Sequence, residues 1–115
     1  MAVEFERAVP VFRIFSLEKA HEFYLGFLGC KVEWEHRFTP DAPVFMQVSR
    51  GTLAINLSEH HGDGTPGSVV YVYTKGVRAL HRELIDKNYR HNRPGLQEQE
   101  SVSYTHLTLP TNREV

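Results

Sequence analysis

The order of predicted elements begins twice along the chain, and this repetition constrains the fold more than any other feature. In the first half, apolar β-prone runs and one helical periodicity predict a strand, a helix and three further strands, at residues 8–15, 16–27, 31–38, 44–49 and 52–58. In the second half a strand and a helix are predicted at residues 68–74 and 77–88, after a polar, glycine-rich loop at 59–67. The pattern indicates an α+β fold with helices on one face of mainly antiparallel sheets.

Alternation within the predicted strands indicates which side chains share a face. Val32, Trp34 and His36 alternate with charged residues, which predicts that these three lie on one side of a half-exposed strand. Arg13 has the same parity as the apolar residues before it in the first strand, so we expect it to point toward any cavity that this strand lines. There it can hold an anionic group of a ligand or form a structural salt bridge. The single cysteine, Cys30, begins the next strand and is expected to be buried.

Length and charge narrow the class of protein. With 115 residues the chain forms one domain, which we place at residues 1–100 with a first module at about 8–58 and an incomplete second module at about 68–100. A net charge of −1 with scattered basic residues argues against nucleic-acid binding. The sequence has no apolar run long enough to span a membrane, no secretory leader pattern and no cysteine pair for a disulfide. We therefore expect a soluble cytoplasmic protein.

Residues 101–115 differ in character from the rest of the chain. Val102–Thr111 can be encoded by GTC TCT TAT ACA CAT CTG ACG CTG CCG ACG, which resembles a translated transposon-end sequencing adapter. We therefore expect a native sequence that ends near Glu100 and a non-native tail after it. The alternation of the tail nevertheless has the period of a strand.

The segment AVPVFRIFSLEKAHEFYLGFLGCKVEW carries a family resemblance. Its Val9-Pro10-Val11 opening, together with Phe23-Tyr24 and Leu28-Gly29 at the end of the helix, resembles the glyoxalase (vicinal oxygen chelate) superfamily, in particular the bleomycin-resistance-protein branch. The resemblance implies glyoxalase-like paired βαβββ modules whose eight strands surround a cavity, with the second module truncated here. It also implies a homodimer, since such half-open modules complete their cavities across a two-fold interface.

The resemblance also implies a test for a metal site. Enzymes of the superfamily bind a divalent metal through four side chains, usually His and Glu, and the first three matching positions here are Val9, Asn56 and Val69. The fourth lies beyond Glu100. Valine has no donor atom and a lone Asn oxygen is a poor ligand for a transition metal. We therefore expect no metal and no cofactor. The loop residues His60 and His61 are interpreted as part of a solvated loop that lies over the cavity mouth or at the dimer interface.

Aromatic side chains take the place of the metal ligands in this comparison. Tyr71 and Tyr73 match the two aromatic residues of the W-x-W pattern in bleomycin-resistance proteins, and Trp34 matches a phenylalanine that lines their cleft. Asn56, Arg13 and His36 would supply polar contacts to a ligand. The alternative is that these residues only pack within the sheets or at their edges.

Three functions are compatible with these residues. The first is a metal-independent protein that binds and sequesters a small molecule such as a bleomycin-type glycopeptide antibiotic, with no catalytic residue. The near-neutral charge counts against bleomycin itself, which is cationic. The second is a metal-dependent lyase or dioxygenase with atypical ligands such as His36. The third is a non-catalytic structural module.

Overall fold

The computed structural model describes residues 2–65, 68–87, 95–99 and 104–108. Its elements follow the order β1 (Val11–Arg13), α1 (Leu17–Ala20), η1 (His21–Phe27), β2 (Lys31–His36), β3 (Phe45–Arg50), β4 (Leu53–Ser58), α2 (Val77–Asp86), β5 (Gly95–Gln99) and β6 (Tyr104–Thr108). Within the described part of the chain, no helix is long and apolar enough to cross a bilayer.

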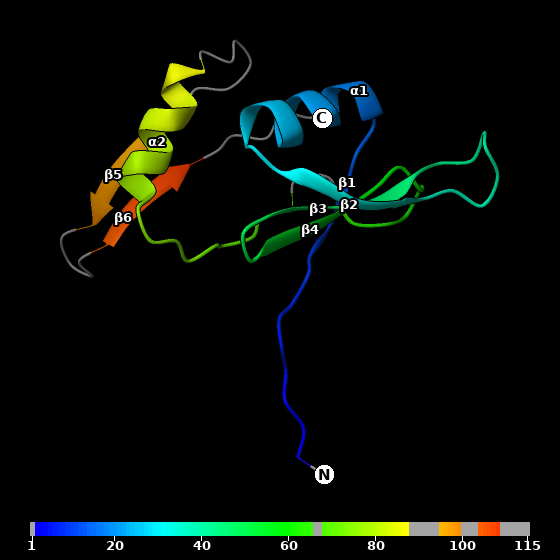
Figure 1. Ribbon diagram of the computed structural model, residues 1–115, viewed down its shortest axis with the longest axis horizontal. Helices are drawn as coiled ribbons and strands as arrows, with labels where there is room; N and C mark the ends of the chain where they lie inside the picture. The colour runs from blue at the N-terminus through cyan, green and yellow to red at the C-terminus, as the bar shows by residue number, and fades with distance from the viewer. Residues whose placement is uncertain (1, 66–67, 88–94, 100–103, 109–115) are drawn as a thin grey trace.

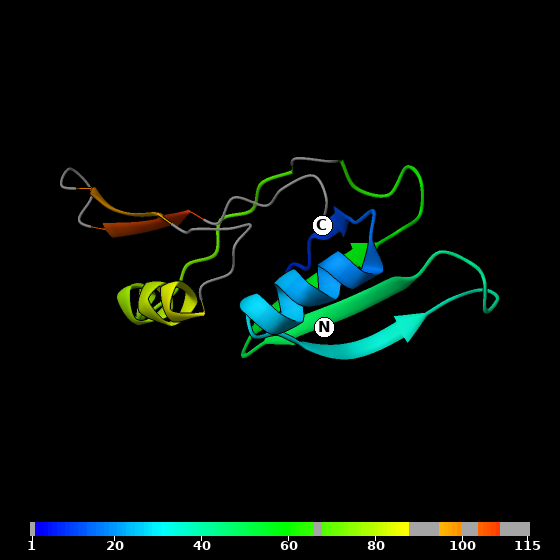
Figure 2. The same cartoon turned by 90° about the horizontal axis from the view of Figure 1, so that it is seen from above.

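The first module is a four-stranded sheet with one helical layer. The strands lie in the order β1-β4-β3-β2, with β1 parallel to β4 and the other neighbours antiparallel. The α1–η1 helix crosses one face of this sheet, while the N-terminal segment runs away from the other side (Figures 1 and 2). The tight turn between β3 and β4 has Gly51 at φ 60°, a conformation that glycine adopts without strain. The predicted α+β arrangement with a helix on one face is confirmed.

The helix begins as predicted and then widens. The Ser16 side chain accepts a hydrogen bond from the backbone N–H of Lys19, 3.2 Å away, which caps the first turn. From His21 onward the winding is π-helical, and the Leu28 N–H reaches back five residues to the Phe23 carbonyl. The buried residues of this helix are Ala20, Phe23, Tyr24 and Phe27.

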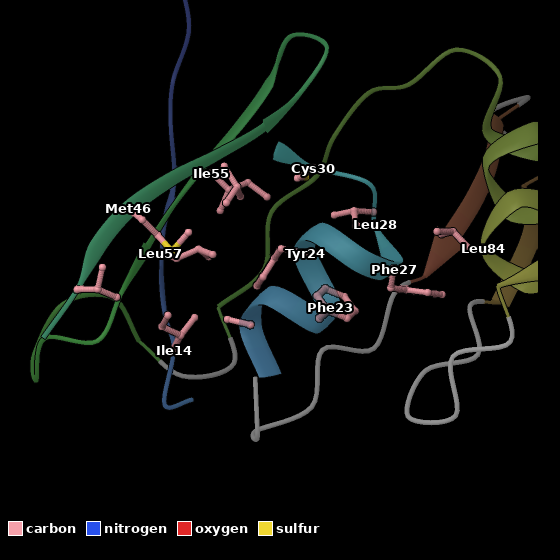
Figure 3. Close-up of a cluster of buried hydrophobic side chains, with 13 residues drawn as sticks. Ile14, Phe23, Tyr24, Phe27, Leu28, Cys30, Met46, Ile55, Leu57 and Leu84 are labelled. Atoms are coloured by element: carbon pink, nitrogen blue, oxygen red, sulfur yellow. The ribbon is translucent and has the colours of Figure 1, made fainter. Parts of the chain in front are cut away.

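The hydrophobic core lies between the helix and the sheet (Figure 3). Alternate residues of β3 and β4 face the helix, namely Val44, Met46, Val48, Ile55 and Leu57, the first of which precedes β3. Cys30 is buried beside them, as predicted. Burial raises the pKa of its thiol, and burial likewise raises the pKa of Tyr24 to about 12. Leu84 of α2 joins the same cluster and is 1% exposed, so the second module packs on the first.

A β-bulge corrects the prediction for β2. The register shifts between Val32 and Trp34: Val32 pairs with Val48, whereas Trp34 pairs with Gln47. Because paired residues share a face of the sheet and Val48 faces the helix, Val32 lies on the helix side and Trp34 lies on the opposite side. Simple alternation from Val32 was therefore wrong, although Trp34 and His36 do share a face.

The second module has its helix but lacks its predicted first strand. Helix α2 packs against the β5–β6 hairpin at one side of the sheet, and β6 lies in the segment whose alternation predicted a strand (Figure 1). Between Ser68 and Thr74, however, the described backbone forms no strand and its residues are exposed. A β-prone run becomes a strand only when a neighbouring edge is available, and no described strand pairs with this one. The predicted end of α2, residue 88, lies outside the described residues.

Candidate functional site

The face of the sheet opposite the helix carries two cross-strand rows of side chains. The pairing register joins one residue from each strand in each row: Val11, Asn56, Gln47 and Trp34 in the first, and Arg13, Ser58, Phe45 and His36 in the second. We call this surface the open face, because the helix covers the other side of the sheet (Figure 2). Four of the six residues predicted for the site, Arg13, Trp34, His36 and Asn56, lie on it.

Aromatic rings group on the β2 and β3 side of the open face. Trp34 stacks on Phe45 with ring centroids 5.6 Å apart and an interplanar angle of 26°. Beyond them, Phe38 makes edge contacts with His36 at 4.9 Å and with His60 at 6.1 Å. Trp34 remains 41% exposed and Phe38 77% exposed. The result is an apolar platform with free aromatic surface, which suits a planar ligand.

The centre of the open face is polar but uncharged. Asn56 and Gln47 are direct cross-strand partners, so their carboxamides are neighbours. The Asn56 Oδ1 atom is enclosed, yet no donor among the described residues reaches it. An enclosed acceptor without a donor costs about 1–3 kcal/mol. A donor N–H or O–H group would stabilise this oxygen, and a rotation of the Asn56 side chain is needed for a donor outside the protein to reach it.

The loop after β4 closes the end of the open face. The buried Ser58 hydroxyl donates to Asp63 Oδ2 at 2.9 Å, and the His60 N–H donates to the same hydroxyl at 3.1 Å. The Glu59 carboxylate accepts from the Val44 N–H at 2.9 Å. At Gly64, with φ +66°, a Cβ would lie 2.9 Å from the Val11 carbonyl oxygen. The described part of the predicted loop, through residue 65, is thus fixed to the sheet.

Charged groups near the open face are already engaged. The Arg13 guanidinium lies 4.8 Å from the centre of the Phe15 ring, and its Nε donates to the Ile14 carbonyl at 3.3 Å. Glu33, at the bulge, accepts a hydrogen bond from Ser49 and pairs with Lys31 at 3.7 Å. These two neighbours, the Ser49 hydroxyl first, lower the pKa of the Glu33 carboxyl.

The structure does not bring Tyr71 and Tyr73 to this surface. They are 75% and 99% exposed on the extended segment 68–74. Conversely, Phe45, Gln47 and Phe38 are open-face residues that the sequence reasoning did not select. Counting back from Asn56 through the Arg50–Gly51 turn would have placed Gln47 and Phe45 on its face.

Comparison with known proteins assigns the fold to a family. The family model described as "Glyoxalase superfamily protein" matches residues 1–107. The chain belongs to the glyoxalase superfamily. No curated protein sequence matches it.

Solved structures with the same fold match this chain at low sequence identity. The crystal structure of SMU.1112c matches with a TM-score of 0.66 and 13% identity, over 97% of this chain and 96% of that one. A glyoxalase family protein from Enterococcus faecalis matches with a TM-score of 0.61 and 8% identity, over 96% and 91%. A glyoxalase/bleomycin resistance protein from Streptomyces sp. CB03234 matches with a TM-score of 0.64 and 15% identity, over 93% and 94%.

The positions that the superfamily resemblance assigns to a metal do not fit one in this chain. Val9 and Val69 offer no donor atom, and Asn56 offers one neutral oxygen. Across the described ranges, no three His, Cys, Asp or Glu side chains are grouped so that they could hold an ion. The open face of this superfamily member is instead an arrangement of aromatic rings and carboxamides.

Proposed function

We propose that this protein binds a small planar molecule on its open face without a metal, and that it sequesters a bleomycin-type antibiotic in this way. The observation that carries the proposal is the Trp34–Phe45 stack, which presents aromatic surface on the side of the sheet away from the helix. Rigid aromatic rings offer contact area at a small entropic cost. The glyoxalase/bleomycin resistance protein among the similar structures is consistent with this reading. No residue is assigned a catalytic role.

We further propose that a second copy completes the site. The segment 68–74 leaves Val69, Tyr71 and Tyr73 at least 75% exposed, which is costly for apolar side chains in water. The radius of gyration is 15.5 Å, larger than the roughly 13 Å of a compact domain of this length. A homodimer in which this segment lies over the open face of its partner would bury the two tyrosines beside Trp34.

The binding proposal is tested by titrating the fluorescence of Trp34, the single tryptophan, with metal-free and copper-loaded bleomycin. We expect saturable quenching at one ligand per subunit with a dissociation constant of about 1 μM or lower. Phe38→Ala, near the rim of the platform, should weaken binding less than Phe45→Ala, which removes the ring under Trp34. A flat titration on folded protein would refute the assignment to this drug class.

The dimer proposal is tested by sedimentation of the wild type and of Tyr71→Ser/Tyr73→Ser. We expect a dimer for the wild type, and a weaker dimer with weaker bleomycin binding for the variant. Val3→Ser/Phe5→Ser is the matched control, because it removes the same kind of exposed apolar surface from the N-terminal segment. A monomeric wild type, or equal effects of the two double variants, would contradict the proposal.

A further inference from the structure

We propose that Asn56 and Gln47 make the site selective for a neutral, amide-bearing flat molecule over cations and anions of the same shape. This inference rests on the proposed binding face and names the chemical class that its centre recognises. The two carboxamides lie in one cross-strand row with Val11 on one side and Trp34 on the other. A ligand ring stacked on Trp34 would place its substituent over this pair.

The hydrogen-bonding capacity of the pair matches an amide. Each carboxamide offers one oxygen acceptor and an NH2 donor, and a ligand amide offers the same two functions in reverse. Asn56 Oδ1 is enclosed and accepts no hydrogen bond within the described structure. A ligand N–H would satisfy this oxygen once the Asn56 side chain rotates toward the open face, and the ligand carbonyl could accept from the NH2 group of Gln47.

The charges around the row explain why an ion is disfavoured. The row itself holds no ionisable side chain. On β1 and β2, the nearest charged side chains of this face are Arg13, directed at the Phe15 ring, and Glu33, held by Ser49 and Lys31. An ion placed at the centre would lose water, and the charges of Arg13 and Glu33 are already partnered. A neutral amide loses less hydration free energy than an ion does. It replaces its hydrogen bonds to water with two hydrogen bonds to the carboxamides.

The test uses three probes that share one ring and differ only in charge and hydrogen bonding: benzamide, benzoate and benzamidinium. Binding is followed by the NMR signals of the Asn56 and Gln47 side-chain NH2 groups and of the Trp34 indole N–H. We expect benzamide to shift all three signals. We expect it to bind about fivefold more tightly than either ion, the ratio that one hydrogen bond of average net strength accounts for.

A charge variant should reverse this preference. Asn56→Asp keeps the acceptor and adds a negative charge, so benzamidinium should become the tightest of the three probes. Thr52→Asp adds the same charge in the exposed turn before β4 and should leave the order unchanged. If Asn56→Asp fails to fold, Gln47→Glu makes the same change on the neighbouring strand.

Two results would overturn the inference: an ion that binds the wild type as tightly as benzamide does, or an order of affinities that neither charge variant changes. Its failure is separable from failure of the proposed function. Bleomycin binding without a preference for benzamide refutes only the amide selectivity. A preference for benzamide without bleomycin binding refutes only the assignment to the drug.

Discussion

Arg50, the last residue of β3, forms a two-pronged ion pair with Glu83 of α2, with nitrogen–oxygen distances of 2.9 and 2.8 Å. Arg50 Nη1 also donates to the Leu28 carbonyl at 3.0 Å, and Lys87 Nζ donates to the Phe27 carbonyl at 2.7 Å. Carbonyl groups at the end of a helix have no partner within the helix. Both cations therefore cap the first helix while they hold α2 beside it, and Glu83 links them.

The Glu83 carboxyl makes this link dependent on pH. The hydrogen bond from Arg50 is the main reason that its pKa lies below the ordinary value. A carboxyl with a lowered folded-state pKa stabilises the fold above its unfolded pKa of about 4.3 and loses this contribution as the pH falls through the folded value. Glu83→Gln should lower the free energy of unfolding at pH 7 by at most about 1 kcal/mol, because both partners are well exposed.

Urea unfolding of both proteins at pH 7 and pH 3 measures this effect. The difference between wild type and Glu83→Gln should shrink at the lower pH, because Glu83 of the unfolded chain is protonated there and the contribution of the ion pair falls. A difference of the same size at both values would show that the ion pair contributes nothing to the pH dependence.

The Ser49–Glu33 hydrogen bond predicts a change in the pKa of Glu33 that NMR can measure. Ser49 is 5% exposed and its hydroxyl donates to the Glu33 carboxylate, which favours the charged form. Ser49→Ala should therefore raise the pKa of Glu33 toward the ordinary value, and titration of the side-chain carboxyl carbons measures this change. The pKa of Glu83, whose partners are Arg50 and Lys87, should stay low in the same variant. If the pKa of Glu33 does not change in Ser49→Ala, Lys31 is the main cause of its lowered value.

Local sequence signals predicted most of the first module, because its strands pair with one another and its helix packs on them. The helix start at residue 16 and the two strands on either side of the Gly51 turn each depend on neighbours in the chain, and the structure has all of them. The bulge at Glu33 was not predictable in this way. It depends on how β2 fits β3, and one extra residue there changes which face Val32 occupies.

The site was only partly predictable for a related reason. The positions of Asn56 on β4 and of Trp34 and His36 on the edge strand β2 follow from the alternation of side chains along each strand. The position of Tyr71 and Tyr73 depends on a partner edge, which residue patterns near 68–74 do not specify. The enclosed Asn56 oxygen is a packing property of three adjacent strands, so only the structure could reveal it.

Gly64 and Gly62 form a matched pair for the loop after β4. Both have positive φ, 66° and 94°, so alanine is strained at either position and should cost about 1 kcal/mol. At Gly64 the added Cβ would also lie 2.9 Å from the Val11 carbonyl oxygen, whereas at Gly62 it would meet nothing within 4 Å. Gly64→Ala should therefore destabilise the protein by about 1–3 kcal/mol more than Gly62→Ala. Equal losses in thermal unfolding would mean that the loop moves away from β1 without cost.

Leu84 and Ile85 test how firmly α2 is attached to the first module. Leu84 is 1% exposed within the shared core, whereas its neighbour Ile85 is 39% exposed. Leu84→Ala should lower the free energy of unfolding by about 2–5 kcal/mol, since it leaves a cavity between the helix and the module. Ile85→Ala should cost less than about 1 kcal/mol, because its side chain is already partly hydrated. Hydrogen exchange gives the sharper measurement: in Leu84→Ala the amides of α2 should lose protection more than those of β3 and β4. Uniform loss across both modules would show that they unfold as a single cooperative unit, with α2 as an integral part of the first core.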